Sequence, residues 1–121
     1  MKRRMMSFAT STILLCGSAL FNQSGGTQVA PRQIEVMVSR FTFSPAEITV
    51  KKSHPVVLLL KSSDVAHGLR FRELNLDARI PQGGTAEMRF TPDKTGDFVG
   101  HCSVFCGSGH GEMALTLHVV E

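Results

Sequence analysis

Hydrophobic residues occupy every second position in several short stretches of the chain. The pattern is clear over 34–38, over 85–90 and over 113–120. Alternation with a period of two indicates β-strands that bury one face. We expect Phe41 and Phe43 to extend the first of these strands.

A second kind of stretch is continuously apolar. Residues 56–60 are two valines followed by three leucines, which is typical of a strand covered on both faces, so we expect a central strand there. Shorter strands are expected over 47–50, 67–71 and 98–102. The segment from Asn75 to Pro81 is expected to be a polar connection.

No helical periodicity of useful length follows residue 33, and Pro, Gly and Asp separate the strands. At 121 residues the chain is long enough for a single domain. The sequence therefore predicts an all-β fold, a Greek-key β-sandwich of about seven or eight strands.

The first 26 residues differ from the rest. Lys2, Arg3 and Arg4 precede a mainly apolar stretch, Met5 to Phe21, and a polar segment of small residues follows. This order is typical of an export signal. We therefore divide the chain into an export signal or single N-terminal membrane anchor, 1–26, and a folded domain, 27–121.

The fate of this segment stays open. Its apolar stretch, about 17 residues, is at the lower limit for spanning a bilayer, so it is either cleaved or kept as an anchor. Lipidation of Cys16 is a further alternative, although Leu15 stands where a lipoprotein signal has a small residue. Each alternative places the domain in the periplasm or on the outer face of the cytoplasmic membrane.

Net charge excludes one class of partner. The formal charge of +3 comes from 13 Lys and Arg against 10 Asp and Glu, and the three cations before Met5 account for the whole surplus. A nucleic-acid-binding domain needs clustered cations to neutralise phosphates. We expect no nucleic-acid partner.

Two cysteines, Cys102 and Cys106, fall in the predicted domain. In an oxidising compartment a disulfide is the usual explanation, but a loop this small would constrain little chain entropy. His110 and Met113 follow closely, which favours a metal site over a disulfide. Thiolate, imidazole and thioether together suit copper, whereas zinc seldom takes a thioether. His67 is a further candidate ligand, whereas His101 is expected to face away, because neighbouring strand residues point to opposite faces.

These residues form the pattern of a distant His followed by C-x-x-x-C-G-x-x-H-x-x-M. The chain from Gln33 to Glu121 thereby resembles the CuA domain of cytochrome c oxidase subunit II, which has a cupredoxin fold. The segment from Asp64 to Gly68 also resembles the matching part of nitrous oxide reductase, whose electron-entry domain carries the same centre.

The resemblance implies a dinuclear copper centre. Cys102 and Cys106 would bridge both ions, with the remaining donors being His67 and Met113 on one copper, and His110 and the backbone carbonyl of Val104 on the other. It also implies single-electron transfer, from a donor such as a c-type cytochrome to a terminal oxidase or reductase, with no catalysis by this chain alone.

Three departures from that family are visible. Val104 stands where subunit II usually has a Glu that helps to hold magnesium. The chain has no Trp, the residue through which the family takes electrons from cytochrome c, and it has one hydrophobic segment in place of two transmembrane helices. Two alternatives therefore stay open: a periplasmic copper chaperone or storage protein, and a mononuclear blue-copper cupredoxin that leaves one Cys unused.

Overall fold

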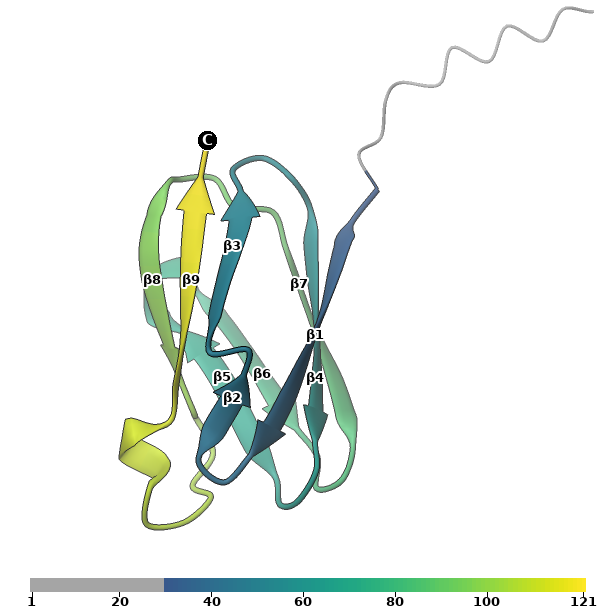
Figure 1. Cartoon of the computed structure of the whole chain (residues 1–121), viewed down its shortest axis with the longest axis vertical. Helices are drawn as coiled ribbons and strands as arrows, with labels where there is room; N and C mark the ends of the chain where they lie inside the picture. The colour runs from purple at the N-terminus through teal and green to yellow at the C-terminus, as the bar shows by residue number, and fades with distance from the viewer. Residues whose placement is uncertain (1–29) are drawn as a thin grey trace, which may run out of the picture.

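The computed structural model describes residues 30–121, which form two β-sheets packed face to face (Figure 1). The export signal or anchor predicted over 1–26, with Cys16, lies outside the described residues. Within 30–121, no helix is long and apolar enough to cross a membrane. The strands are β1 Arg32–Ser39, β2 Thr42–Ser44, β3 Glu47–Lys51, β4 Val56–Ser62, β5 His67–Phe71, β6 Leu76–Ile80, β7 Thr85–Phe90, β8 Gly96–His101 and β9 Ala114–Val120, with short 3-10 turns η1 Arg72–Leu74 and η2 His110–Glu112.

One sheet has four strands in the order β2-β1-β4-β7. β1 and β4 run parallel, and β7 pairs antiparallel with the other edge of β4. β4 is therefore an interior strand, as its continuous apolar sequence predicts. Its alternate residues Val56, Leu58 and Leu60 are buried against the second sheet.

The second sheet has five strands in the order β3-β9-β8-β5-β6. β9 lies between β3, to which it is parallel, and β8, to which it is antiparallel. β5 and β8 are paired at a single register, Arg70 opposite His101. Towards the ligand end the two segments stay close together, since a Cβ on Gly68 would lie 3.2 Å from the backbone nitrogen of Val104.

The hydrophobic core lies between the sheets and is built from the alternating positions. Burial of apolar side chains contributes about 25 cal/mol per Å², so this shared face is the main stabilising element of the fold. Its fully buried members are Val36, Val38, Leu58, Leu60, Leu69, Ile80, Met113, Leu115 and Leu117.

The all-β sandwich is confirmed, with nine strands among the described residues instead of seven or eight. Two predictions about its details were wrong. Phe43 does not extend β1, because the chain reverses at Arg40 and Phe41 and returns as β2. The segment from Asn75 to Pro81 contains β6, whose inward residues Leu76, Ala78 and Ile80 alternate with polar ones.

Candidate metal centre

The predicted copper donors meet at one end of the sandwich, where the loop between β8 and β9 folds beside the start of β5. His67 is the first residue of β5, and Cys102 follows the last residue of β8. The backbone N–H of Cys102 donates to the carbonyl of Met113 at 3.1 Å, which closes the loop at its base. We call residues 102–113 the ligand loop.

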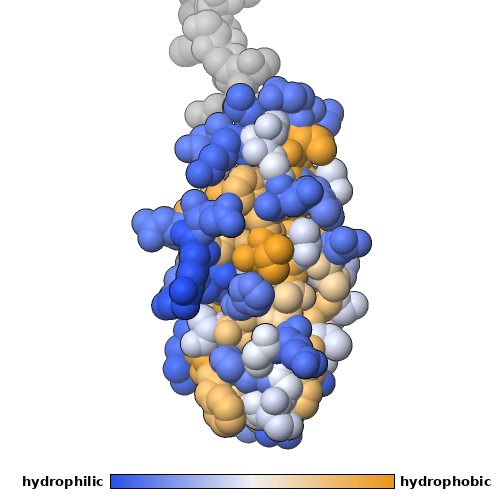
Figure 2. Space-filling view, turned by 90° about the vertical axis from the view of Figure 1, so that its left-hand side faces the viewer, coloured by the Kyte–Doolittle hydropathy of each residue, from blue (hydrophilic) through white to orange (hydrophobic). Residues whose placement is uncertain are grey.

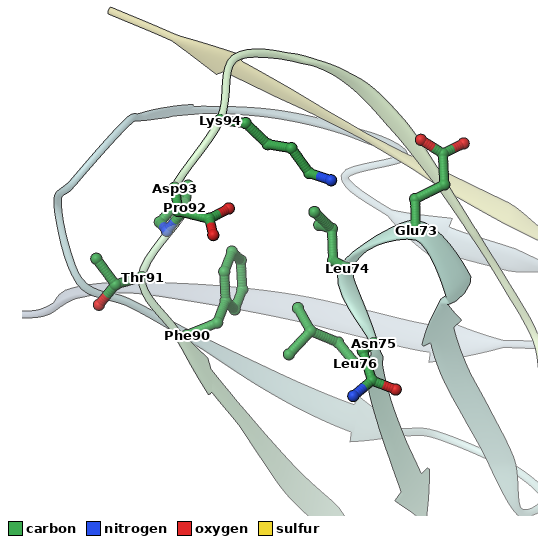
Figure 3. Close-up of a pocket in the computed structure, with 9 residues that line it drawn as sticks. All are labelled: Glu73, Leu74, Asn75, Leu76, Phe90, Thr91, Pro92, Asp93 and Lys94. Carbon is green, nitrogen blue, oxygen red and sulfur yellow. The ribbon is translucent and has the colours of Figure 1, made fainter.

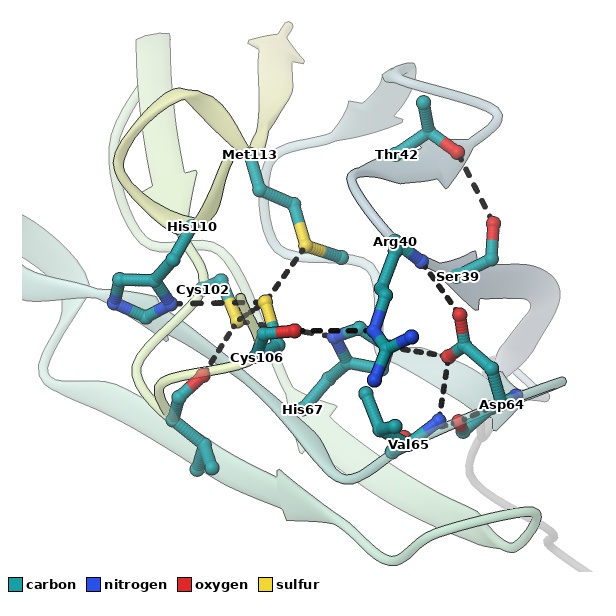
Figure 4. A network of polar contacts seen from close by, with 12 residues as sticks. Ser39, Arg40, Thr42, Asp64, Val65, His67, Cys102, Cys106, His110 and Met113 are labelled. Carbon is teal, nitrogen blue, oxygen red and sulfur yellow. Dashed lines mark hydrogen bonds and ion pairs between the residues drawn. The ribbon is translucent and has the colours of Figure 1, made fainter. Parts of the chain in front are cut away.

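Three of the donors form a tight cluster. Ligand atoms of His67, Cys102 and Cys106 all lie within 4.8 Å of one another, and the three residues are buried (Figure 4). The sulfur of Cys102 is 4.0 Å from Nδ1 of His67. Soft sulfur and borderline nitrogen donors converge on one point, as a copper site requires.

The two cysteines are free thiols whose sulfur atoms are 3.6 Å apart. A disulfide bond is about 2.05 Å long, so the pair is not covalently linked. Metal–thiolate bonds are about 2.3 Å long, so two sulfurs that share an ion lie no more than about 4.6 Å apart. The observed spacing fits thiolates that share metal ions.

Three more donors surround the two sulfurs. On the Cys106 side, the sulfur is 3.7 Å from Nδ1 of His110 and 3.8 Å from the sulfur of Met113. On the Cys102 side, the sulfur lies 3.1 Å from the carbonyl oxygen of Val104. Each cysteine therefore has one imidazole and one additional donor beside it.

Exposure distinguishes the two imidazoles. His67 has no exposed surface, whereas His110 is half-buried. The exposed neighbour of His110 is Phe105, whose ring centroid lies 5.6 Å away. His110 is therefore the imidazole through which the cluster meets the surface.

Asp64 orients His67. Its Oδ1 lies 2.7 Å from Nε2 of the imidazole, and its Oδ2 accepts a hydrogen bond from the backbone N–H of Arg40 at 2.8 Å. Burial opposes ionisation, but the hydrogen bonds from Arg40, His67 and Val65 together lower the pKa of Asp64. An ionised carboxylate only accepts hydrogen bonds, so Nε2 donates to Asp64 and Nδ1 is the ring nitrogen that faces the sulfurs.

The turn between β1 and β2, which contains Arg40 and Phe41, packs against the ligand loop. Nε of Arg40 donates to the carbonyl of Cys106 at 3.2 Å. A Cβ on Gly109 would lie 2.5 Å from the ring of Phe41, so that ring packs directly against the loop backbone. Gly107 has φ of +140°, a conformation that favours glycine over any other residue. The ligand positions are thus fixed by packing.

Burial raises the pKa of the Cys106 thiol to about 11, and the neighbouring Cys102 adds to the effect, whereas Arg40 opposes it. Without a metal this thiol stays protonated at neutral pH. Thiolate is the form that binds copper, so metal binding releases the proton and becomes tighter as pH rises.

The structure brings all six predicted residues together, namely His67, Cys102, Val104, Cys106, His110 and Met113. It also reveals three supporting residues that we did not predict, Arg40, Phe41 and Asp64. Only Asp64 left a signal in the sequence, as a carboxylate three residues before a histidine.

A pocket of about 320 Å³ lies away from this cluster, between η1 and the β7–β8 connection (Figure 3). Its polar members, among them Glu73, Asp93 and Lys94, surround Leu74, Leu76 and Phe90. None of the predicted donors lines it. The sulfur–histidine cluster is therefore the stronger candidate for the functional site.

Comparison with known proteins agrees with this geometry. The family model of the cupredoxin-like domain matches residues 8–114. Cytochrome c oxidase subunit 2 of Thermus thermophilus is 31% identical over 96 residues, which cover 78% of this chain and 71% of that protein.

Solved structures match the chain in fold. A heme-copper terminal oxidase dimer matches with a TM-score of 0.65 and 25% identity, over 74% of this chain and 65% of that one. The periplasmic domain of cytochrome oxidase subunit II of Bradyrhizobium japonicum matches with a TM-score of 0.67 and 20% identity, over 78% and 88%. The chain therefore belongs to the cupredoxin-like family, resembles cytochrome c oxidase subunit 2 within it, and carries a cluster of His67, Cys102 and Cys106 whose donors suit a copper ion.

Proposed function

We propose that the cluster holds two copper ions and that the protein passes single electrons. The observation that carries this proposal is the pair of thiols 3.6 Å apart with a separate imidazole beside each sulfur. A mononuclear cupredoxin site uses one thiolate with two imidazoles, and its second cysteine would have no role.

In this proposal Cys102 and Cys106 would hold both ions as shared thiolate ligands. His67 and Met113 would serve one ion, and His110 with the Val104 carbonyl would serve the other. Bridging allows donors that lie nearest to different cysteines to serve the same ion. The pair of copper ions, when bound, supplies a one-electron redox couple shared over both metals and both sulfurs.

The residues around the cluster keep its geometry constant. Asp64 holds the ring of His67, Arg40 holds the carbonyl of Cys106, and Phe41 packs against Gly109. Ligands that are fixed before the metal arrives need little rearrangement when the charge of the site changes. Low rearrangement favours fast and reversible electron transfer.

The relatives support a place in a respiratory chain. We propose that the domain is exported, works in the periplasm or at the outer face of the membrane, and carries electrons from a donor such as a c-type cytochrome to a terminal oxidase or reductase. Val104 offers no side-chain carboxylate for magnesium, so the proposal includes no magnesium site. The chain alone breaks and forms no substrate bonds.

Electron paramagnetic resonance of the copper-loaded protein tests this proposal. We expect two coppers per chain and a hyperfine pattern from two equivalent nuclei, and we expect Cys106→Ser to abolish that pattern. A pattern from one nucleus would replace the proposal with a mononuclear cupredoxin. Loss of copper to a mild chelator in both oxidation states would indicate a copper chaperone or store.

A further inference from the structure

A pocket of about 190 Å³ opens beside the copper cluster, on the outer side of the five-stranded sheet. It is not the pocket of Figure 3, and it contains side chains that the proposed electron transfer does not use. Its lining residues are Arg70, Arg72, His101, Cys102, Ser103 and His110, of which two are proposed copper donors and none is acidic.

The guanidinium of Arg70 is held in place at this pocket. Its Nε and Nη2 donate to Oδ2 of Asp77 at 3.0 and 2.6 Å, and Ser103 donates to Oδ1 of the same carboxylate at 3.1 Å. The hydrogen bond from Arg70 is the main reason why the pKa of Asp77 is lowered, so this carboxylate stays ionised and compensates Arg70. The remaining nitrogen of Arg70, Nη1, makes no hydrogen bond within residues 30–121.

Arg72 is different. It is exposed and forms no ion pair with any residue that the structure describes. His101, also exposed, lies opposite Arg70 across the β5–β8 pairing. The pocket thus contains one uncompensated cation together with imidazole and guanidinium donors, which is the arrangement that holds a carboxylate or another oxyanion.

An exposed aromatic ring lies on the same part of the surface. Phe105 is 78% exposed, and its ring is tilted at 49° against that of His110. The lower end of Figure 2, where the ligand loop lies, includes hydrophobic surface, and strongly hydrophilic side chains line the left edge above it. We call Arg70, Arg72, His101, Phe105 and His110 the docking surface.

We propose that this docking surface binds an acidic electron-transfer partner, with a carboxylate of the partner in the pocket and an apolar contact over Phe105. The proposal rests on the proposed function and names the partner of the same site. It places the half-buried His110 at the centre of the contact, so electrons would cross through its exposed edge. Charge steering with a small apolar centre suits a partner that must bind quickly and leave again.

Two exposed carboxylates stand next to lining residues in the sequence without lining the pocket themselves. Glu73 follows Arg72 in η1, and Glu112 lies in η2, two residues after His110. Attraction of an acidic partner therefore depends on Arg72. Arg79 provides a matched control, because it is an exposed arginine on the neighbouring strand β6 and lies outside the pocket.

The first test uses the metal-free, full-length chain and inorganic phosphate as the probe. Saturable phosphate shifts in the NMR signals of His101 and His110 are expected, with affinity about threefold to tenfold weaker in Arg72→Gln and unchanged in Arg79→Gln. Equal effects of the two substitutions, or shifts that never saturate, would overturn the pocket. This test needs no copper, so its outcome is independent of the copper proposal.

The second test uses the copper-loaded protein and two small redox reagents. Hexacyanoferrate(III) takes one electron from the reduced site and becomes hexacyanoferrate(II), whereas hexaammineruthenium(II) gives one electron to the oxidised site and becomes the ruthenium(III) complex. Arg72→Gln is expected to slow the anionic reagent about threefold more than Arg79→Gln does, and not to slow the cationic one.

Three outcomes of the second test have defined meanings. If Arg72→Gln slows both reagents alike, the effect is not electrostatic and the docking proposal is wrong. If phosphate binds but the rate with the anionic reagent is unchanged, the pocket is a free oxyanion site and not a docking surface. If only the rate with the anionic reagent falls, the docking surface is supported.

Discussion

Two histidine–carboxylate pairs in this protein have nearly equal lengths and opposite surroundings. Nε2 of His67 lies 2.7 Å from Asp64, and the imidazole has no exposed surface. Nδ1 of His118 lies 2.6 Å from Asp97 on the outer face of the second sheet, where the side chain is 32% exposed and its other nitrogen faces Glu47 at 3.4 Å.

The difference lies in the free nitrogen. Asp64 is hydrogen-bonded to Nε2 of His67, and Nδ1 of the same ring faces the sulfur of Cys102. In His118 both ring nitrogens face carboxylates. The first arrangement leaves one ring nitrogen available to a metal, and the second favours a protonated imidazole. An identical pair of residue types therefore has two functions, which neighbours and burial decide.

The two pairs should differ most in copper binding and stability when the imidazole of each is removed. His67→Ala is expected to abolish the dinuclear copper signal and to lower the free energy of unfolding by about 2 to 4 kcal/mol, because a fully buried side chain leaves a cavity. His118→Ala is expected to retain the copper signal. Copper-to-protein ratio, paramagnetic resonance and denaturant unfolding measure both effects, and a dinuclear signal retained in His67→Ala would remove this residue from the ligand set.

Substitution of the carboxylate of each pair should give a smaller difference, in copper affinity. Asp64→Asn loses the acceptor that fixes the ring and protonation of His67, so copper affinity is expected to fall about tenfold to a hundredfold. Asp97→Asn is the matched control and is expected to leave copper affinity unchanged. Competition with a chelator measures the ratio, and equal affinities of the two variants would show that Asp64 does not position the ligand.

The packing beneath the ligand loop can be tested with two glycines. A Cβ on Gly109 would meet the ring of Phe41 at 2.5 Å, whereas a Cβ on Gly111 would meet nothing within 4 Å. Gly109→Ala is therefore expected to destabilise the protein by about 1 to 3 kcal/mol, and Gly111→Ala by less than about 0.5 kcal/mol. Urea unfolding of the metal-free protein checks this, and similar midpoints would contradict close packing of the loop on Phe41.

The smallest effect is the pH dependence of the exposed pair. The hydrogen bond to Asp97 is the main reason why the pKa of His118 is raised from its ordinary value of 6.5, with Glu47 contributing. The stabilisation is complete below that ordinary value and is lost as pH rises through the raised pKa in the folded protein. The stability difference between wild type and His118→Gln should thus shrink as pH rises from the ordinary pKa of 6.5 through the raised pKa of the folded protein. A constant difference in urea unfolding would show that the pair does not titrate as described.

The clustering of the candidate donors was predictable because most of them are local in the sequence. Cys102, Cys106, His110 and Met113 occupy one short loop with a recognisable spacing. His67 was a further candidate from its residue type, and the family resemblance strengthened it and supplied the Val104 carbonyl. The alternation of hydrophobic and polar residues also predicted most strands. Physical chemistry alone identified the donor types, and the resemblance assigned them to two ions.

The supporting contacts were not predictable, because they join segments far apart in the chain. The hydrogen bond from Arg40 to Cys106 spans 66 residues, and the one from Arg40 to Asp64 spans 24. Nothing in the local pattern of Arg40 distinguishes it from a solvated turn residue. β6 was missed for a different reason, since Asn75 and Pro81 mark turns at both ends of a short alternating segment.

β9 supplies no donor, yet it begins one residue after Met113 and pairs with both β3 and β8. Met113 therefore leads directly into a strand that is paired on both sides, and the N–H of Cys102, at the other end of the ligand loop, donates to the carbonyl of Met113. A substitution at the buried Leu117 would reach the metal through the backbone without touching it. Differences in copper affinity between relatives of this chain should accordingly be sought in their last strand as well as in their ligands.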